Sequence, residues 1–273
     1  MVTEPAETCL VISLFGPLRF QSAGGFHALN LTGTTRDLLA FLLVRGGMPA
    51  RRDVLVATFW PDSTMDKGRS ALTTAIWRIK KVLAGLPQVT LRAIDDLIVL
   101  ELGPGVVLDA VALRHGLTLA RADGKALSEA AEVALAVAVE RCSGVALEGC
   151  DAHWALAERE HLAGLHLAGL LMLMQGAEAR GDWADALQWG RALLAVDALN
   201  EAVHHRMIAL YARAGERRRA VLQFETLRQL LRDELGVMPD AETVALRNRI
   251  LTSTPAVPVS PRMRVRDAAV THL

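Results

Sequence analysis

Two stretches in the second half of the sequence repeat one another at a spacing of 34 residues. AEARGDWADA, residues 177–186, aligns with YARAGERRRA, residues 211–220, so that Gly181 matches Gly215 and Ala186 matches Ala220. A glycine at the turn and small alanines at helix contacts are typical of helix pairs that stack along the chain. Such pairs bury their apolar faces only by stacking, so we expect a third pair nearby, formed by residues 151–174.

Helical periodicity extends from Ala110 to about Leu251, and the 34-residue period is that of the tetratricopeptide repeat. Breaks are predicted at residues 122–124, residues 143–144 and three single glycines, Gly181, Gly215 and Gly236. We therefore predict an all-α, tetratricopeptide-like domain over residues 109–254. Residues 255–273 contain three prolines and no periodicity, which predicts a flexible tail.

Residues 63–83, STMDKGRSALTTAIWRIKKVL, form a second informative stretch. Leu72, Ile76, Ile79 and Leu83 recur at helical spacing and form one apolar stripe. The opposite face carries hydrogen-bonding, aromatic and cationic groups: Ser70, Thr73, Thr74, Trp77, Arg78, Lys80 and Lys81. A helix that is buried on one side and basic on the other suits the DNA major groove, although an ordinary solvated helix has the same pattern.

Short β-favouring runs surround this helix and two others that precede it. Runs at residues 10–15, 18–21 and 27–31 predict a small N-terminal antiparallel sheet, and residues 89–93 and 97–102 predict a hairpin. Sheet, three helices and hairpin, in this order, predict a winged helix-turn-helix over residues 1–108.

The two helices before residue 63 are predicted from local signals. Thr34 opens the first, with Asp37 as its capping-box acid. The second begins near Arg51 and places Val54 and Leu55 on its inner side. The fold class is therefore mainly α: an α+β winged helix followed by an all-α repeat domain.

Charge is unevenly distributed although the formal net charge of the 273 residues is zero. Residues 34–83 contain nine Lys/Arg and four Asp, a local net charge of +5. One basic module in a neutral protein fits local attraction to phosphate. The three cysteines have no CxxC spacing, so we expect no zinc site, and we expect Cys142 and Cys150 to act as small hydrophobes.

At this point the first half resembles a known family. LFGPLRF (14–20), RDLLAFLLVRGGMPARRDVLVATFWPD (36–62) and GRSALTTAIWRIKKVL (68–83) are similar to the winged-helix domain of the Streptomyces antibiotic regulatory proteins, which is related to the OmpR/PhoB-type DNA-binding domain. Residues 197–251 and the run LRDELGVMP (231–239) resemble the bacterial transcriptional activation domain that follows it in the same regulators.

The resemblance implies two sets of functional residues. By resemblance, the DNA-contacting set comprises Ser70, Thr73, Thr74, Trp77, Arg78 and Lys81. We add Arg69 and Lys80 of the same basic helix and, in the hairpin, Arg92, which could reach the DNA backbone. The loop that would contact RNA polymerase comprises Pro61, Asp62, Ser63, Thr64 and Asp66. For Trp77, contact with DNA and packing against the second domain are equally compatible with its place on the exposed face.

The resemblance further implies a cytoplasmic activator that binds promoter direct repeats, with double-stranded DNA and RNA polymerase as partners and a homodimer formed through the helical domain. We expect no enzyme activity, cofactor or metal, because no catalytic or phosphate-binding motif is present and His161, His166, His204 and His205 have poor spacing for ligands. We also expect no membrane association: the apolar run 162–174 is too short to span a bilayer.

With about nine residues before the first predicted strand and no nucleotide-binding module, we expect control through abundance, self-association or something bound by the helical domain. The competing hypothesis is a docking module whose winged helix no longer binds DNA. It rests on Thr73, which stands where arginine is common in the family, and on Asp95 and Asp96 at the hairpin turn, because phosphate would repel two carboxylates there.

Overall fold

The computed structural model describes residues 9–122 and 127–252. The chain divides into two compact units, Met1–Gly176 and Ala177–Leu273, and the boundary falls inside one long helix. The predicted tail, residues 255–273, and residues 123–124 of one predicted break lie outside the described residues.

The first unit begins with a four-stranded sheet of order β3–β2–β1–β7. β1 (Leu10–Ser13), β2 (Arg19–Ser22) and β3 (Gly25–His27) are antiparallel neighbours, whereas β7 (Val106–Leu108) lies parallel to β1. The third strand was predicted later, at residues 27–31. It starts at Gly25 because Ser22 pairs with Gly25 across a tight turn.

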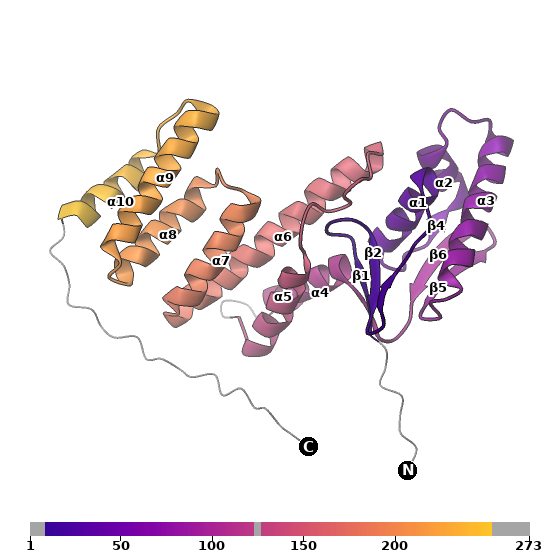
Figure 1. Cartoon of the computed structure of the whole chain (residues 1–273), viewed down its shortest axis with the longest axis horizontal. Coiled ribbons are helices and arrows are strands. Elements are labelled where there is room, and N and C mark those ends of the chain that lie inside the picture. The colour runs from indigo at the N-terminus through magenta and orange to yellow at the C-terminus, as the bar shows by residue number, and fades with distance from the viewer. Residues whose placement is uncertain (1–8, 123–126, 253–273) are drawn as a thin grey trace, which may run out of the picture. The chain divides into compact units, whose positions relative to one another are not determined.

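Three helices and a second sheet follow, and together they form the predicted winged helix-turn-helix (Figure 1). The second sheet has the order β4–β6–β5, with β5 and β6 as the hairpin. Its core is built from fully buried leucines and isoleucines of all three helices, including Leu38, Leu55, Leu72 and Ile79. The elements are α1 (Gly33–Val44), β4 (Ala50–Arg51), α2 (Arg52–Phe59), α3 (Met65–Leu83), β5 (Val89–Ile94) and β6 (Leu97–Leu102).

Two local predictions in this region are wrong. The capping box of Thr34 and Asp37 does not form: α1 is capped at Thr32 without a side-chain bond, and Asp37 is hydrogen-bonded to the Cys150 side chain. Val54, predicted to face inward, is 49% exposed, and Val56 is buried in its place. The inward face of α2 is set by contact with α3, which no local pattern specifies.

Three further helices belong wholly or partly to the first unit: α4 (Asp109–Ala122), α5 (Glu129–Arg141) and α6 (His153–Arg180). The predicted third helix pair from residues 151–174 is wrong, because these residues lie mostly within the single continuous α6. Gly169 does not break the helix but serves packing: a Cβ there would lie 2.8 Å from Cγ2 of Val139 on α5.

Residues 143–150, which we call the strap, tie these helices to the N-terminal sheet. The Leu147 N–H donates to the Leu14 carbonyl at 2.7 Å, and the Arg36 guanidinium donates to the Glu148 carbonyl at 2.8 Å. From α6, the guanidinium of Arg159 donates to three strap carbonyls, those of Ala146, Leu147 and Cys150. The compact unit that contains the winged helix therefore extends well beyond residue 108.

The second unit is a stack of helices made from the end of α6 with α7 (Trp183–Val196), α8 (Glu201–Arg213), α9 (Arg217–Leu235) and α10 (Ala241–Thr252) (Figure 1). The 34-residue repeat is confirmed, because equivalent positions of its two copies have the same backbone geometry. Gly181 and Gly215 both have left-handed φ, 74° and 77°. The N–H that follows each glycine donates to the residue five positions earlier, Asp182 to Ala177 and Glu216 to Tyr211.

Candidate nucleic-acid interface

The amphipathic pattern of α3 is confirmed. Its stripe of Leu72, Ala75, Ile76, Ile79 and Leu83 is buried against the winged-helix core. The opposite side is exposed along the helix. We call this side the α3 face, which consists of Arg69, Ser70, Thr73, Thr74, Trp77, Arg78, Lys80 and Lys81, all exposed.

The cations of the α3 face form no ion pairs within the described residues. Within residues 9–122 and 127–252, no ion pair involves Arg69, Arg78, Lys80 or Lys81. Lys67 at the start of α3 is also exposed, and it was not among the predicted contacts although its charge was part of the local excess. The side chains are therefore available to an external anion.

The two threonine hydroxyls of the α3 face donate to their own helix. Thr73 Oγ1 donates to the Arg69 carbonyl at 2.9 Å, and Thr74 Oγ1 donates to the Ser70 carbonyl at 3.1 Å. Each hydroxyl oxygen still has lone pairs that can accept a hydrogen bond from outside, and the methyl group of each threonine can make an apolar contact. In this conformation Thr73 and Thr74 can therefore accept hydrogen bonds from an external partner or make apolar contacts with it.

Trp77 is 61% exposed, and the Lys81 Nζ lies 5.3 Å from its ring centroid. The parts of the predicted helical domain that share its compact unit, α4, α5 and most of α6, leave the indole uncovered. At this distance the Lys81 ammonium makes a cation–π contact with the exposed indole.

The hairpin turn between β5 and β6 differs in character from the α3 face. Arg92 is paired with Glu101 on the neighbouring strand at 2.8 Å, so its charge is already compensated. Asp95 has a left-handed φ of 51° and is exposed, and the Asp96 carboxylate lies 3.9 Å from the Arg51 guanidinium.

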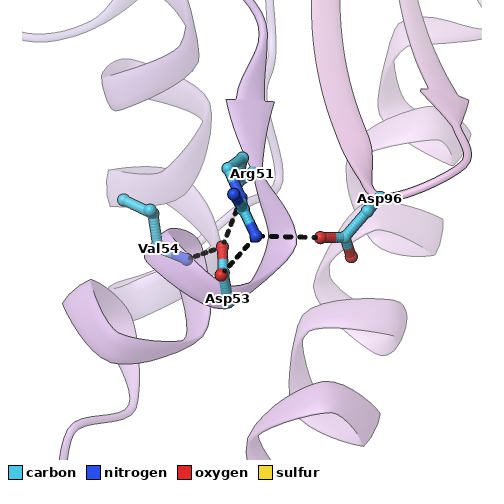
Figure 2. A network of polar contacts seen from close by, with 4 residues as sticks. All are labelled: Arg51, Asp53, Val54 and Asp96. Atoms are coloured by element: carbon cyan, nitrogen blue, oxygen red, sulfur yellow. Dashed lines mark hydrogen bonds and ion pairs between the residues drawn. The ribbon is translucent and has the colours of Figure 1, made fainter.

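Arg51 is shared between two carboxylates, as Figure 2 shows. It pairs with Asp53 at 2.9 Å, and Asp53 also accepts the Val54 N–H at 2.8 Å. The backbone completes the link, because the Arg52 N–H donates to the Asp96 carbonyl at 2.9 Å. The turn is thus anchored to the start of α2 and presents net negative charge.

The predicted polymerase-contact residues are all exposed between α2 and α3. Pro61, Asp62, Ser63 and Thr64 form the connecting loop, while Asp66 lies in the first turn of α3 rather than in the loop. Phe59, at the end of α2, packs edge-on against Trp154 of α6 with 6.0 Å between the ring centroids, and it makes a tilted contact with Trp60 at 6.1 Å between centroids.

Comparisons with known proteins identify the second half of the chain. Residues 108–251 match the bacterial transcriptional activator domain. The chain belongs to this family. With its winged helix in front of the domain, it has the arrangement of the Streptomyces antibiotic regulatory proteins, a family of transcription regulators.

Two known proteins are similar to this chain over most of its length. It is 31% identical over 259 residues to the regulatory protein AfsR of Streptomyces coelicolor, covering 93% of this chain and 25% of AfsR, so it spans a quarter of that relative's length. A solved structure of Mycobacterium tuberculosis EmbR in complex with a low-affinity phosphopeptide superposes with a TM-score of 0.64. That match covers 92% of this chain and 67% of EmbR at 21% identity, which establishes a shared fold.

No group of metal-ligating side chains occurs in the described part of this regulator. His166 and His204 are buried, and burial lowers the pKa of both imidazoles. The His204 ring lies between the Ala198 carbonyl and the Gln223 amide, at 3.0 and 2.7 Å. These histidines are packing residues.

The cysteines of the described chain are free thiols. Cys142 and Cys150 are buried, as expected for small hydrophobes, and Cys9 is exposed. Burial raises the pKa of the Cys150 thiol to about 11 and raises that of Cys142 as well. Because thiolates are the reactive species, neither buried cysteine is a nucleophile near neutral pH.

α6 is long and apolar enough, by length and composition alone, to cross a membrane. Two of its charged residues nevertheless make contacts inside the first unit, where Glu158 pairs with Arg114 at 2.7 Å and Arg159 binds the strap. Leu162, Leu170 and Leu173 are buried there. α6 is therefore a core helix of the regulator.

Proposed function

We propose that this regulator binds double-stranded DNA by placing the α3 face in the major groove and that it activates transcription. The observation that carries the proposal is the set of four exposed cations on the α3 face, none of them in an ion pair within the described chain, opposite a buried stripe. Unpaired Lys and Arg on one free helix face supply the phosphate attraction that dominates DNA affinity.

The roles within the face follow from the chemistry of each side chain. Arg78 is the candidate for a bidentate contact to guanine, because its planar guanidinium matches the two acceptors of that base. Thr74 and Trp77 are candidates for contact with thymine methyl groups, and Lys80 and Lys81 for contact with phosphates. The hairpin contributes little, since Arg92 is paired with Glu101 and the turn is acidic.

The family resemblance supports the remaining parts of the proposal. Operators are promoter direct repeats, and the loop 61–64 with Asp66 contacts RNA polymerase in the cytoplasm. Its exposure beside the α3 face supports this role. A homodimer forms through the helical domain over residues 109–254, and the winged-helix domain covers residues 1–108.

The first experiment titrates the protein against DNA upstream of its own and neighbouring genes at several salt concentrations. Each phosphate contact adds about −0.9 to the slope of log K against log salt, so the contacts of Lys80 and Lys81 alone would give a slope of about −2 per protomer. Lys80→Glu with Lys81→Glu should abolish specific binding. The matched control, Arg218→Glu with Arg219→Glu on α9, makes the same change in net charge and should leave binding unchanged.

A specific site with a steep salt slope supports the proposal. Weak binding to any DNA, unaffected by the α3 reversal, would contradict it and favour a protein-docking role for the winged helix.

Arg78→Ala should weaken specific binding by about 1–3 kcal/mol and relax preference at one base pair. Competition with operators substituted at single positions measures both effects. Unchanged affinity and preference would remove Arg78 from the readout.

A further inference from the structure

Lysine is rare in this chain, and it is concentrated on α3. Of the 30 Lys and Arg residues, 26 are arginines and four are lysines: Lys67, Lys80, Lys81 and Lys125. The first three lie in α3, and Lys125 lies outside the described residues. Within the part of the chain that the structure describes, every cationic residue outside α3 is therefore an arginine.

The C-terminal ends of the helices show the same contrast. α3 has Lys80 and Lys81 in its last turn. Every other described helix with a basic residue in its last turn has an arginine there: Arg121 in α4, Arg141 in α5, Arg180 in α6, Arg213 in α8, Arg232 in α9 and Arg249 in α10. Arginine is thus the cation that this chain places at helix C-termini, and α3 is the exception.

Neither the helix dipole nor contact with phosphate requires lysine at these positions. Both cations are favourable near the C-terminus of a helix. Arginine also binds phosphate, through two parallel hydrogen bonds. What lysine has and arginine lacks is a side-chain amine that can be acylated. Within the described residues, the side-chain amines are therefore confined to the helix that carries the proposed DNA contacts.

The amines of Lys80 and Lys81 are accessible from solvent. Both side chains are exposed, and no ion pair involves either of them within the described residues. The contact of Lys81 Nζ with the Trp77 ring, at 5.3 Å from the centroid, lies on the same exposed face, where the indole is itself 61% exposed. A small acyl donor can therefore reach both nitrogens when DNA is not bound.

We propose that Lys80 and Lys81 are an acylation site and that their acylation releases the regulator from DNA. The donor is an activated acyl group, carried as a mixed anhydride with phosphate or as a thioester. The unprotonated Nζ attacks the acyl carbonyl carbon, so that an N–C bond forms and the C–O bond to phosphate or the C–S bond to the thiol breaks. The leaving group takes the bonding electron pair, and the proton lost from Nζ passes to water.

The effect on DNA binding follows from the loss of charge. This inference rests on the proposed function, because it concerns control of the same α3 face. Acylation turns each ammonium into a neutral amide, which cannot replace a counterion of phosphate. With about −0.9 in the salt slope for each contact, loss of both should reduce the slope by about 2 and weaken binding at 0.1 M salt by up to about 60-fold. Acylation of Lys81 also removes its cation–π contact with Trp77, a neighbouring candidate for base contact.

The test treats the full chain with acetyl phosphate in one sample and with acetyl-CoA in another. Mass spectrometry measures acetylation at each lysine, and titration with DNA that contains the specific site measures binding. Wild type should gain acetyl groups at Lys80 and Lys81 and should lose affinity as these positions fill. The donor that modifies them shows whether the acyl group comes from the mixed anhydride or from the thioester. If neither donor acetylates Lys80 or Lys81, the proposal is overturned.

Matched variants separate this site from other effects of the reagents. Lys80→Arg with Lys81→Arg keeps both charges but removes both amines, so treatment should leave the affinity of this variant at its own untreated value. Lys67→Arg changes a lysine of the same helix outside the α3 face, and this variant should stay as sensitive to treatment as wild type. An equal loss of affinity in wild type and in the double arginine variant would overturn the proposal.

Failure of this inference is distinguishable from failure of the proposed function. Lys80→Gln with Lys81→Gln carries the neutral amides without treatment and should bind DNA as weakly as the acetylated protein. If this variant and wild type bind DNA alike, the α3 face does not hold DNA and both proposals fall. If the variant binds weakly while acetylated wild type keeps its affinity, the acylation site alone is wrong.

Discussion

Gly68 allows α2 and α3 to meet, and so it positions the α3 face. It is buried, and a Cβ there would lie 2.5 Å from Cγ1 of Val56, a distance at which something must move. Val56 is buried and β-branched, so its methyl group cannot swing away freely. The close crossing of the two helices therefore depends on a missing side chain.

Gly68→Ala should lower the free energy of unfolding by up to about 2 kcal/mol, because a helix-propensity gain of about 1 kcal/mol offsets only part of an overpacking penalty of up to about 3 kcal/mol. The control is Gly164→Ala in α6, where no atom lies within 4 Å of the added Cβ, and this variant should be more stable than wild type. Urea denaturation measures both. Equal stabilisation by the two alanines would show that α2 yields to α3 without strain.

Asp109 is the fully buried carboxyl at the start of α4, and it holds the N-terminal sheet to the helices. Its oxygens accept the N–H groups of Leu14, Phe15 and Ala110 at 2.8, 2.9 and 2.7 Å. Burial outweighs these bonds and raises the pKa of Asp109 to about 6.

This shift predicts a dependence of stability on pH. The folded state holds the Asp109 proton up to about pH 6, whereas the unfolded state releases it near pH 3.8. Between these values the native state binds more protons, so the stability from Asp109 is full below pH 3.8 and is lost as pH rises through 6. The loss amounts to about 3 kcal/mol.

Urea midpoints of wild type and Asp109→Asn across pH 4–7 measure this dependence. The variant should be less stable near neutral pH, because an amide cannot accept at both positions. Its stability should also lack the fall seen in wild type over this range. Parallel pH profiles would contradict the raised pKa.

At the scale of elements, the repeat shows how a local pattern fixes helix contacts. Ala186 of α7 and Ala220 of α9 are both 0% exposed at equivalent positions, and Leu193 and Leu227 follow each of them at the same interval and are buried as well. The helices contact their neighbours through these alanines, which explains why the 34-residue period is visible in the sequence.

Ala186→Leu and Ala220→Leu should each lower the free energy of unfolding by about 1–3 kcal/mol, since three extra carbon atoms must enter a filled contact. Ala184→Leu, at an exposed position of α7, is the control and should be near neutral. Thermal and urea denaturation provide the comparison. A disruptive Ala184→Leu or a neutral Ala186→Leu would contradict the packing described.

At the scale of the whole molecule, the winged helix shares a core with the first part of the activator domain. The family match begins at residue 108, yet the first compact unit extends to Gly176. Asp109, the strap and Trp154 lie on the far side of residue 108, and Trp154 packs at 5.1 Å from Phe41 of α1. The start of the family match therefore does not coincide with the boundary between the two compact units.

A fragment that ends at residue 108 should be much less stable than one that ends at residue 180, because the shorter chain loses these contacts and exposes apolar surface. Circular dichroism and thermal denaturation of the two fragments measure the difference. Two fragments of equal stability would show that the winged helix folds alone.

The sequence by itself determined those features that depend on local periodicity. The α3 face, the buried stripe, the order of elements in the winged helix and the 34-residue repeat all follow from side-chain spacing along one helix or one chain segment. Because a helix presents residues at fixed angular intervals, spacing is enough to define its faces, and the structure agrees.

Only the tertiary structure decided which buried groups meet. The bonds from Leu14 and Phe15 to Asp109 join residues more than 90 positions apart, and the link from Asp37 to Cys150 replaced a plausible capping box. The inward turn of Val56 instead of Val54 depends on Gly68 of another helix. Such contacts are chosen by the fit of side chains from different segments, and periodicity within one segment carries no information about that fit.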